Sequence, residues 1–238
     1  MKQDCILFLF GDEWGEIDTV LPLIQSIKKK KKLRIIVLIK KDSTFQKRKK
    51  FSDLFKILSK NSDLILYPSY FSLKTIIKNE FFKITSIKDF KNLIMFFYKL
   101  IKREDYNVNP NLYKSEIQKK FNIKFFCNTA GTIIDFSWFN LGKNTKYLIV
   151  PHAPTFKGGK LHKFRTCDLK KHDENRKKKF EYYKNYPNST KFFTSNNDEK
   201  LFFKKYCPKN LKLIPIGFTR LEKEWIDTIK KNKFKKKK

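Results

Sequence analysis

The chain has 238 residues and a mass of 28.7 kDa, and its 55 Lys and Arg against 23 Asp and Glu give a formal net charge of +32. Its 25 Phe exclude wholesale disorder, and its 7 Gly and 8 Pro are too few for a fibrous protein. No apolar run approaches the ~18 residues that a membrane-spanning helix needs. We expect one large domain over residues 1–231 and a disordered Lys-rich tail at 232–238.

The positive charge comes from 49 Lys and only six Arg. Arg is the residue that forks onto guanine and phosphate, whereas Lys acts as a point charge. The lysines are spread along the chain without a nucleic-acid-binding motif, and Phe, Ile and Asn, which also have A/T-rich codons, are abundant too. We therefore expect no specific nucleic acid partner. Peripheral contact with an anionic inner-membrane surface is a better explanation of the lysine-rich composition than nucleic-acid binding, because runs of Lys gain energy there without specific geometry.

The first 70 residues alternate between strand and helix patterns. Apolar runs predict strands, and apolar residues at helical spacing predict the helices between them. The predicted strands are Cys5–Phe10, Leu33–Ile39 and Asp63–Tyr67, and the predicted helices are Thr19–Lys30 and Ser43–Lys60, with a loop over Gly11–Asp18. Pro22 is expected in the first turn of its helix, where Pro is tolerated. This alternation indicates a parallel sheet with right-handed crossovers.

A helix over Ile87–Arg103 is apolar on nearly all sides, which favours burial. The alternative is that its extra aromatic residues enter a membrane surface, with Lys91, Lys99, Lys102 and Arg103 at the rim.

Alternation then resumes to the end of the chain. Strands are predicted at Ile123–Asn128, Tyr147–Val150, Lys191–Thr194 and Leu211–Ile216, helices at Thr132–Leu141, Asp198–Tyr206 and Leu221–Lys231, and a loop with a helix over Lys160–Tyr186. The whole pattern predicts a Rossmann-like α/β domain, with a mostly parallel sheet flanked by helices.

The cysteine and histidine positions favour neither disulfides nor a metal site. Cys5 and Cys127 lie in apolar runs, where a free Cys behaves as a small hydrophobic residue. The N-terminus leads directly into a strand-like run without a signal sequence, so we expect a cytoplasmic protein without disulfides. His152, His162, Cys167 and His172 match no zinc spacing. We expect no metal and no cofactor.

Three loops that follow predicted strands are candidate ligand sites, because ligands of open α/β sheets lie outside the carboxyl ends of the strands. The first, Gly11–Asp18, holds Asp12, Glu13, Glu16 and Asp18, and Gly11 and Gly15 allow close approach of a ligand. A carboxylate beside a helix N-terminus can act as a base toward a hydroxyl. Capping of the helix by these acids is the alternative.

The second loop, Val150–Gly159, carries His152 and Lys157 between two prolines and a Gly pair. A His there is placed for proton transfer or phosphate contact, or for a structural bond to nearby backbone. The third, Ile216–Arg220, leads through Gly217 into a helix N-terminus that could bind an anion together with Arg220. An ordinary strand–Gly–helix junction is the alternative there.

These motifs resemble two families of surface-polysaccharide enzymes. Trp14-Gly15-Glu16-Ile17 followed by Leu21-Pro22-Leu23-Ile24 resembles the start of Kdo transferases, in which the corresponding Glu is the catalytic base. Pro151-His152-Ala153-Pro154 with Lys157, and Gly217-Phe218-Thr219-Arg220, resemble stretches of CDP-glycerol glycerophosphotransferases, although Ala153 and Thr219 depart from that family's Gly and Pro.

Both families have the two-domain GT-B fold, and the resemblance covers its first, acceptor-side domain. It implies transfer of a sugar or polyol phosphate from a nucleotide-activated donor to a glycan or lipid-linked acceptor. Glu16 would be the base, His152 would assist, and Asp12, Gly15, Lys157, Gly217 and Arg220 would bind substrate. A second chain would supply the other domain, if the gene was split at the closing run of lysines. A non-catalytic binding or regulatory subunit and a Lys-rich nucleic-acid binder remain the alternatives.

Overall fold

A computed structural model describes residues 2–11, 15–30, 32–51, 53–72, 74–76, 87–101, 110–130, 136–151, 180–204, 206–217 and 223–234. The strands are β1 (Gln3–Phe10), β2 (Arg34–Ile39), β3 (Leu64–Leu66), β4 (Phe121–Thr129), β5 (Lys146–Val150), β6 (Thr190–Thr194) and β7 (Leu211–Pro215). The helices are α1 (Gly15–Lys30), α2 (Asp42–Phe51), α3 (Asp53–Asn61), α5 (Ile87–Ile101), α6 (Pro110–Lys120), α8 (Asn197–Lys204) and α9 (Lys223–Phe234), with 3-10 turns η1 (Pro68–Tyr70) and η2 (Phe136–Phe139).

The seven strands form one sheet in the order β3-β2-β1-β4-β5-β6-β7, and every neighbouring pair is parallel. The strand order runs outward from β1 in one direction and from β4 in the other, as in a doubly wound Rossmann-like fold. The predicted α/β fold class is therefore confirmed, and the sheet is parallel throughout.

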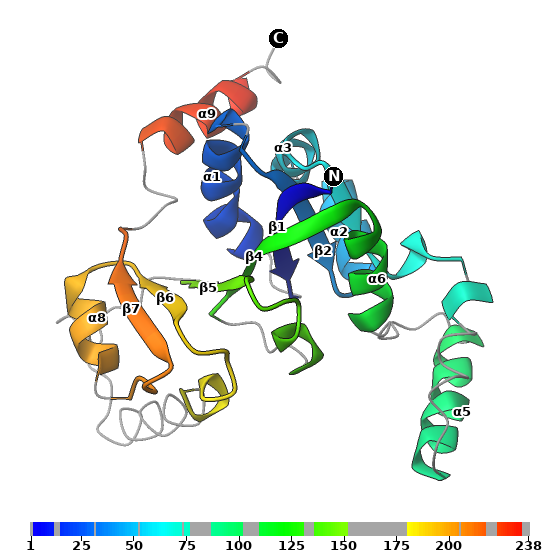
Figure 1. Ribbon diagram of the computed structural model, residues 1–238. Helices are drawn as coiled ribbons and strands as arrows, with labels where there is room; N and C mark the ends of the chain where they lie inside the picture. The colour runs from blue at the N-terminus through cyan, green and yellow to red at the C-terminus, as the bar shows by residue number, and fades with distance from the viewer. Residues whose placement is uncertain are drawn as a thin grey trace, which may run out of the picture.

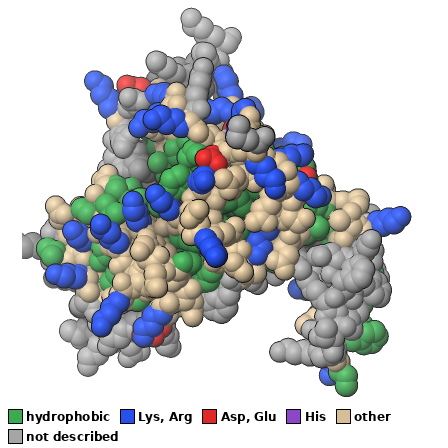
Figure 2. Space-filling model, in the orientation of Figure 1, with side chains coloured by type: hydrophobic (Ala, Val, Ile, Leu, Met, Phe, Trp, Pro, Cys, Tyr) green, Lys and Arg blue, Asp and Glu red, His purple; other side chains and the backbone are tan. Residues whose placement is uncertain are grey.

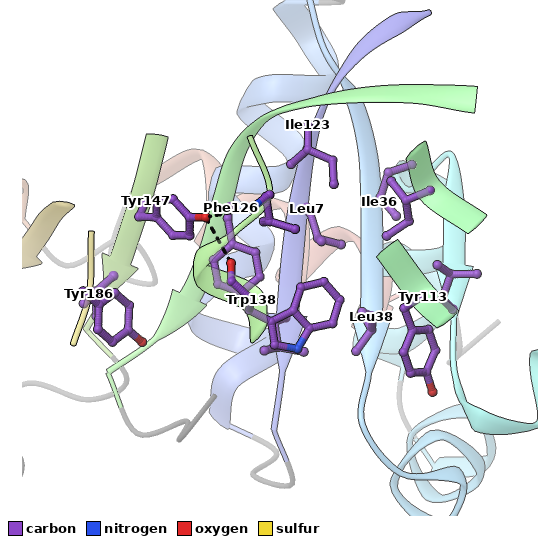
Figure 3. Packing of buried hydrophobic residues seen from close by; sticks show 14 of the residues in the cluster. Leu7, Ile36, Leu38, Tyr113, Ile123, Phe126, Trp138, Tyr147 and Tyr186 are labelled. Carbon is purple, nitrogen blue, oxygen red and sulfur yellow. Dashed lines mark hydrogen bonds between the residues drawn. The ribbon is translucent and has the colours of Figure 1, made fainter. Parts of the chain in front are cut away.

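Both faces of the sheet are buried, as is typical of parallel sheets. In β1, Cys5–Phe10 are all at most 2% exposed. Leu7 and its alternating neighbours face one cluster, together with residues of α6 and η2, whereas Phe8 and its neighbours face a second cluster with α1, α2, α3 and α9. Figure 1 shows α9 lying beside α1, and Figure 3 shows the first cluster, in which Phe126 and Trp138 stack.

A bulge in β4 changes which face its side chains occupy. The pairing with β1 shifts between Cys5, which lies opposite Ile123, and Ile6, which lies opposite Phe125. One extra residue therefore lies in β4, and a shift by one residue sends later side chains to the other face. As a result, Ile123 and Phe126 share one face of the sheet, and Cys127 lies on the face of α1.

Three expectations about the first helices are wrong. The loop expected through Asp18 ends earlier, because α1 begins at Gly15. Glu16 and Asp18 lie in its first turn, where acids complement the positive end of the helix dipole. Pro22 consequently lies well inside α1 rather than in its first turn, where it removes one backbone hydrogen bond. The single helix expected over Ser43–Lys60 is two helices, α2 and α3, each with an Asp in its first turn.

Later elements differ in length, in type and, for α5, in burial. The helix expected over Thr132–Leu141 contains, in its described part, only the short η2 turn, and α6 was not expected. Helix α9 extends to Phe234, beyond the expected end at residue 231. The expected burial of α5 is wrong on one side: Leu93 and Phe96 are buried, but the large apolar residues Ile87, Phe90, Ile94, Met95 and Tyr98 are exposed. No helix among the described residues is long and apolar enough to cross a membrane.

Asp63 ties three elements together at the amino-terminal edge of the sheet. Its carboxylate accepts hydrogen bonds from the Ile35 backbone N–H at 2.8 Å, from Lys28 Nζ at 2.8 Å and from Arg34 Nη1 at 3.2 Å. Burial acts to raise the pKa of this carboxyl, but the three donors and the Lys28 charge outweigh it and hold the pKa below its ordinary value. The carboxylate therefore stabilises the junction of α1, β2 and β3.

We predict that Asp63→Asn lowers the free energy of unfolding by about 1–3 kcal/mol at pH 7, because it weakens charge-assisted hydrogen bonds. A carboxyl with a depressed pKa contributes stability above its unfolded pKa and loses that contribution as pH falls through its folded pKa. The gap between wild type and variant should therefore narrow below about pH 3.9 in urea denaturation. Asp53→Asn, which removes a more exposed ion pair with Lys56, is the control and should cost at most about 0.5 kcal/mol. If the difference in unfolding free energy between wild type and Asp63→Asn persists unchanged in acid, the depressed pKa of Asp63 is wrong.

Candidate functional site

The candidate site lies where the strand order reverses, between the carboxyl ends of β1 and β4. The connections from two such strands lead to opposite faces of a doubly wound sheet, which opens a crevice between them. Here α1 follows β1 on one face, and η2 follows β4 on the other. Ligands of this fold class bind in that crevice.

Glu16 lies at this switch point and is bonded to the neighbouring strand. It occupies the first turn of α1 and is 2% exposed. Its Oε1 accepts a hydrogen bond of 2.6 Å from the hydroxyl of Thr129, which ends β4 and is itself 0% exposed. The bond joins the start of α1 to the adjacent strand, so it fixes the direction of the carboxylate as well as the position of the helix.

The segment between β1 and α1 lacks the sequence signature of a phosphate-binding loop. It reads Gly11-Asp12-Glu13-Trp14-Gly15 and lacks the G-x-G-x-x-G fingerprint of dinucleotide-binding proteins. A pyrophosphate at the start of α1 would meet the negative charge of Glu16 in the position where phosphate-binding helices offer free N–H groups. A carboxylate in that place is suited to accept a proton from a hydroxyl.

A second set of polar side chains lies on the other face of β4. Asn128 Nδ2 donates to the Tyr186 hydroxyl at 3.0 Å, and the Tyr183 hydroxyl donates to the Ala130 carbonyl. Burial raises the pKa of both tyrosines, so their hydroxyls stay protonated. The Tyr183 hydroxyl acts as a donor and the Tyr186 hydroxyl accepts from Asn128. These contacts fix the chain that follows β4 against residues 180–186.

A second buried acid at the same edge has a structural role. Glu199 Oε2 accepts hydrogen bonds from the backbone N–H and the hydroxyl of Ser195, and Asn196 Oδ1 accepts one of 2.7 Å from the Glu199 N–H. Asn196 therefore acts as the N-cap of α8, and Glu199 bonds back to Ser195, the residue before the cap. Glu199 thus stabilises the start of its own helix, whereas Glu16 bonds to a neighbouring strand.

The predicted site residues separate into three groups. Gly15 and Glu16 lie together at the start of α1. Gly217, with a φ of +83° that suits glycine, follows β7 at the same edge of the sheet, but β7 is four strands from β1, or about 19 Å. Asp12, His152, Lys157 and Arg220 lie outside the described residues, as do His162, Cys167 and His172.

The expected common cleft of Glu16 and His152 remains a prediction. The described chain ends at Pro151, directly after β5, and β5 is two strands from β1, or about 10 Å. A hollow lies at the opposite, amino-terminal edge of the sheet, and its lining includes Asp63 with its partners Lys28 and Arg34. Its Lys28 and Arg34 already bond to Asp63, so it is not a candidate for catalysis.

No protein family, curated protein or solved structure matches the chain. The geometry of the site is therefore the basis for its interpretation. The described residues contain no group of His, Cys, Asp and Glu side chains that could hold a metal ion. Cys5 and Cys127 are buried among apolar side chains, as expected, and burial raises the pKa of both thiols, that of Cys5 to about 12. Neither is therefore a nucleophile at neutral pH.

Sequence reasoning missed Asn128 and Thr129. The signal was present: two polar residues close an apolar strand pattern, and the rule that selected Glu16 applies equally to the end of β4. The bulge in β4 hides which of them faces α1. Tyr183 and Tyr186 carry no comparable signal, because aromatic residues are frequent throughout this chain.

We predict that Thr129→Val lowers the free energy of unfolding by about 1.5–3 kcal/mol, because it removes a hydrogen bond to a buried carboxylate. Thr194→Val is the matched control. Thr194 is also 0% exposed and also ends a strand at this edge, but its hydroxyl donates to the neutral carbonyl of Asn196 at 3.1 Å. Its loss should cost about 0.5–1.5 kcal/mol in the same urea titration. Equal losses would contradict the special role of the Glu16 contact.

Proposed function

We propose that this chain is the acceptor-side domain of a transferase that moves a sugar or polyol phosphate from a nucleotide-activated donor to a hydroxyl of a glycan or lipid-linked acceptor. The observation that carries the proposal is the carboxylate of Glu16, held by Thr129 at the point where the strand order reverses between β1 and β4. The resemblance of the Glu16 and His152 motifs to Kdo transferases and CDP-glycerol glycerophosphotransferases supports the choice of reaction.

In the proposed reaction, the carboxylate of Glu16 accepts the proton of the acceptor hydroxyl. The acceptor oxygen forms a bond to the anomeric carbon or phosphorus of the donor, and the bond from that atom to the nucleotide breaks. The nucleotide leaves with the electron pair. Thr129 is a positioning residue, since its hydrogen bond fixes the direction of the carboxylate. His152 would assist proton transfer, and Lys157 and Arg220 would offset phosphate charge.

The burial of Glu16 favours one alternative function. A side chain that is 2% exposed and bonded to the adjacent strand also suits a non-catalytic binding domain, in which Glu16 only anchors α1. The two functions differ in the effect of replacing the carboxylate by its amide. If Glu16 is only an anchor, Gln at this position keeps most of the hydrogen bonding to Thr129 and the function is retained. If Glu16 is the base, Gln cannot accept the proton and transfer is lost.

We predict that Glu16→Gln reduces transfer by at least about 100-fold and leaves the chain folded, with a loss of at most about 1.5 kcal/mol in the free energy of unfolding. The amide oxygen still accepts from Thr129, as a neutral acceptor, but no longer takes a proton. The measurement is nucleotide release from CDP-glycerol and a panel of nucleotide sugars, with glycan and lipid-linked acceptors. Glu116→Gln, on α6 at the opposite edge of the sheet, is the control and should be fully active.

Activity that survives within a few-fold in Glu16→Gln would show that Glu16 is an anchor only. Calorimetric titration of the wild-type chain with the same donors and acceptors separates the remaining possibilities. Acceptor binding alone is expected of both an acceptor-side domain and a non-catalytic binding domain, and turnover identifies the transferase. Binding of neither donor nor acceptor overturns both functions.

A further inference from the structure

Helix α5 carries an apolar stripe on its solvent side. The exposed fractions of its large apolar side chains range from 49% at Tyr98 to 82% at Ile87. Residues 87, 90, 94 and 98 follow one another at intervals of three and four, so they lie in one row along the helix, with Met95 beside it. Isolated exposed apolar residues are ordinary, but a continuous row is typical of an interaction surface.

The stripe faces away from the protein core. Leu93 and Phe96, on the opposite side of the helix, are buried and belong to the cluster beneath the sheet. Figure 1 shows α5 at the periphery of the fold, and Figure 2 shows hydrophobic side chains with a basic one beside them at that end of the molecule. The helix is thus attached by one side and presents the other outward.

The positive charge of the chain favours an anionic bilayer over a second copy of the protein as the partner of this stripe. Lys91 is exposed among the apolar residues, and the chain as a whole carries +32. A second copy would bring the same positive charge to the interface, which opposes self-association. An anionic bilayer offers both an apolar layer and negative headgroups. The 15 residues of α5 are about 22 Å long, shorter than the ~30 Å hydrocarbon core, so the helix would lie along the surface.

We propose that α5 docks the protein on anionic lipid bilayers by inserting Ile87, Phe90, Ile94, Met95 and Tyr98 at the headgroup boundary, with Lys91 contacting lipid phosphates. The helix acts as an interfacial anchor. This inference does not depend on the proposed transferase activity, because it uses residues remote from the crevice between β1 and β4.

The test is cosedimentation of the full chain with vesicles of phosphatidylcholine containing 30% phosphatidylglycerol, and with vesicles of phosphatidylcholine alone. We expect binding to the anionic vesicles that falls at least tenfold in the triple variant Phe90→Ser, Ile94→Ser, Met95→Ser. Leu201→Ser is the matched control, since Leu201 on α8 is equally exposed but lies outside the stripe. Wild-type binding that is absent, or that the triple variant retains, overturns the proposal.

A second measurement keeps the proposal falsifiable if the triple variant misfolds. Tryptophan introduced as Phe90→Trp should shift its emission to shorter wavelength on addition of the anionic vesicles, and Leu201→Trp should not. Equal shifts at both positions, or none at position 90, would overturn the proposal. Sedimentation velocity tests whether the stripe binds a second copy of the protein instead. A dimer that the triple variant abolishes would assign the stripe to self-association and overturn the proposal.

Discussion

The structure depends on the burial of β1 on both sides. This strand pairs with β2 on one edge and with β4 on the other, both in parallel, and its apolar residues from Cys5 to Phe10 contact helices above and below the sheet. A parallel strand can be buried in this way only if crossover connections place helices on both faces. The reversal of strand order beside β1 therefore follows from the same requirement that forms the core, and Glu16 lies at the point of reversal, beside the end of β4.

The chemistry at this point of the sheet follows from what the start of α1 already contains. Many α/β proteins leave the N–H groups of this helix free for phosphate, whereas here Glu16 occupies the first turn and bonds to Thr129. The acid that stabilises the helix end also removes it as a phosphate site. In the proposed transferase, a donor phosphate would then bind elsewhere along the carboxyl edge, and the acceptor hydroxyl is the group that Glu16 would suit. The proposed division between acceptor and donor sides rests on this electrostatic argument.

The positive charge of the chain supports the proposed contact of α5 with a membrane, although its distribution along the sequence did not point to that helix. Lysines spread along a sequence indicate a solvated surface, but an amphipathic helix with exposed apolar residues needs only a few cations nearby to favour an anionic bilayer. Attachment along α5 would hold the domain at the surface where lipid-linked acceptors lie. The membrane proposal and the transferase proposal are therefore compatible, although each rests on separate residues.

Local sequence determined much of this protein. The apolar runs at Cys5–Phe10 and Leu33–Ile39 are typical of strands buried on both faces, and their alternation with amphipathic helices predicts the parallel sheet. Glu16 could be selected because it follows the first such strand. The sequence did not determine where α1 begins, because both a loop and a helical turn accommodate the acids before Thr19. In the structure these acids lie in the first turn of the helix, where they complement its dipole.

Tertiary structure alone decided which side chains meet. Regular alternation from Ile123 would place Thr129 on the same face as Ile123, but the bulge in β4 moves Thr129 to the face of α1 and Asn128 to that of Tyr186. A bulge depends on how one strand pairs with another, so the sequence of β4 does not reveal it. The burial of α5 likewise depends on how much neighbouring surface is available: its apolar residues exceed what the core can cover, and the fold leaves one row in solvent.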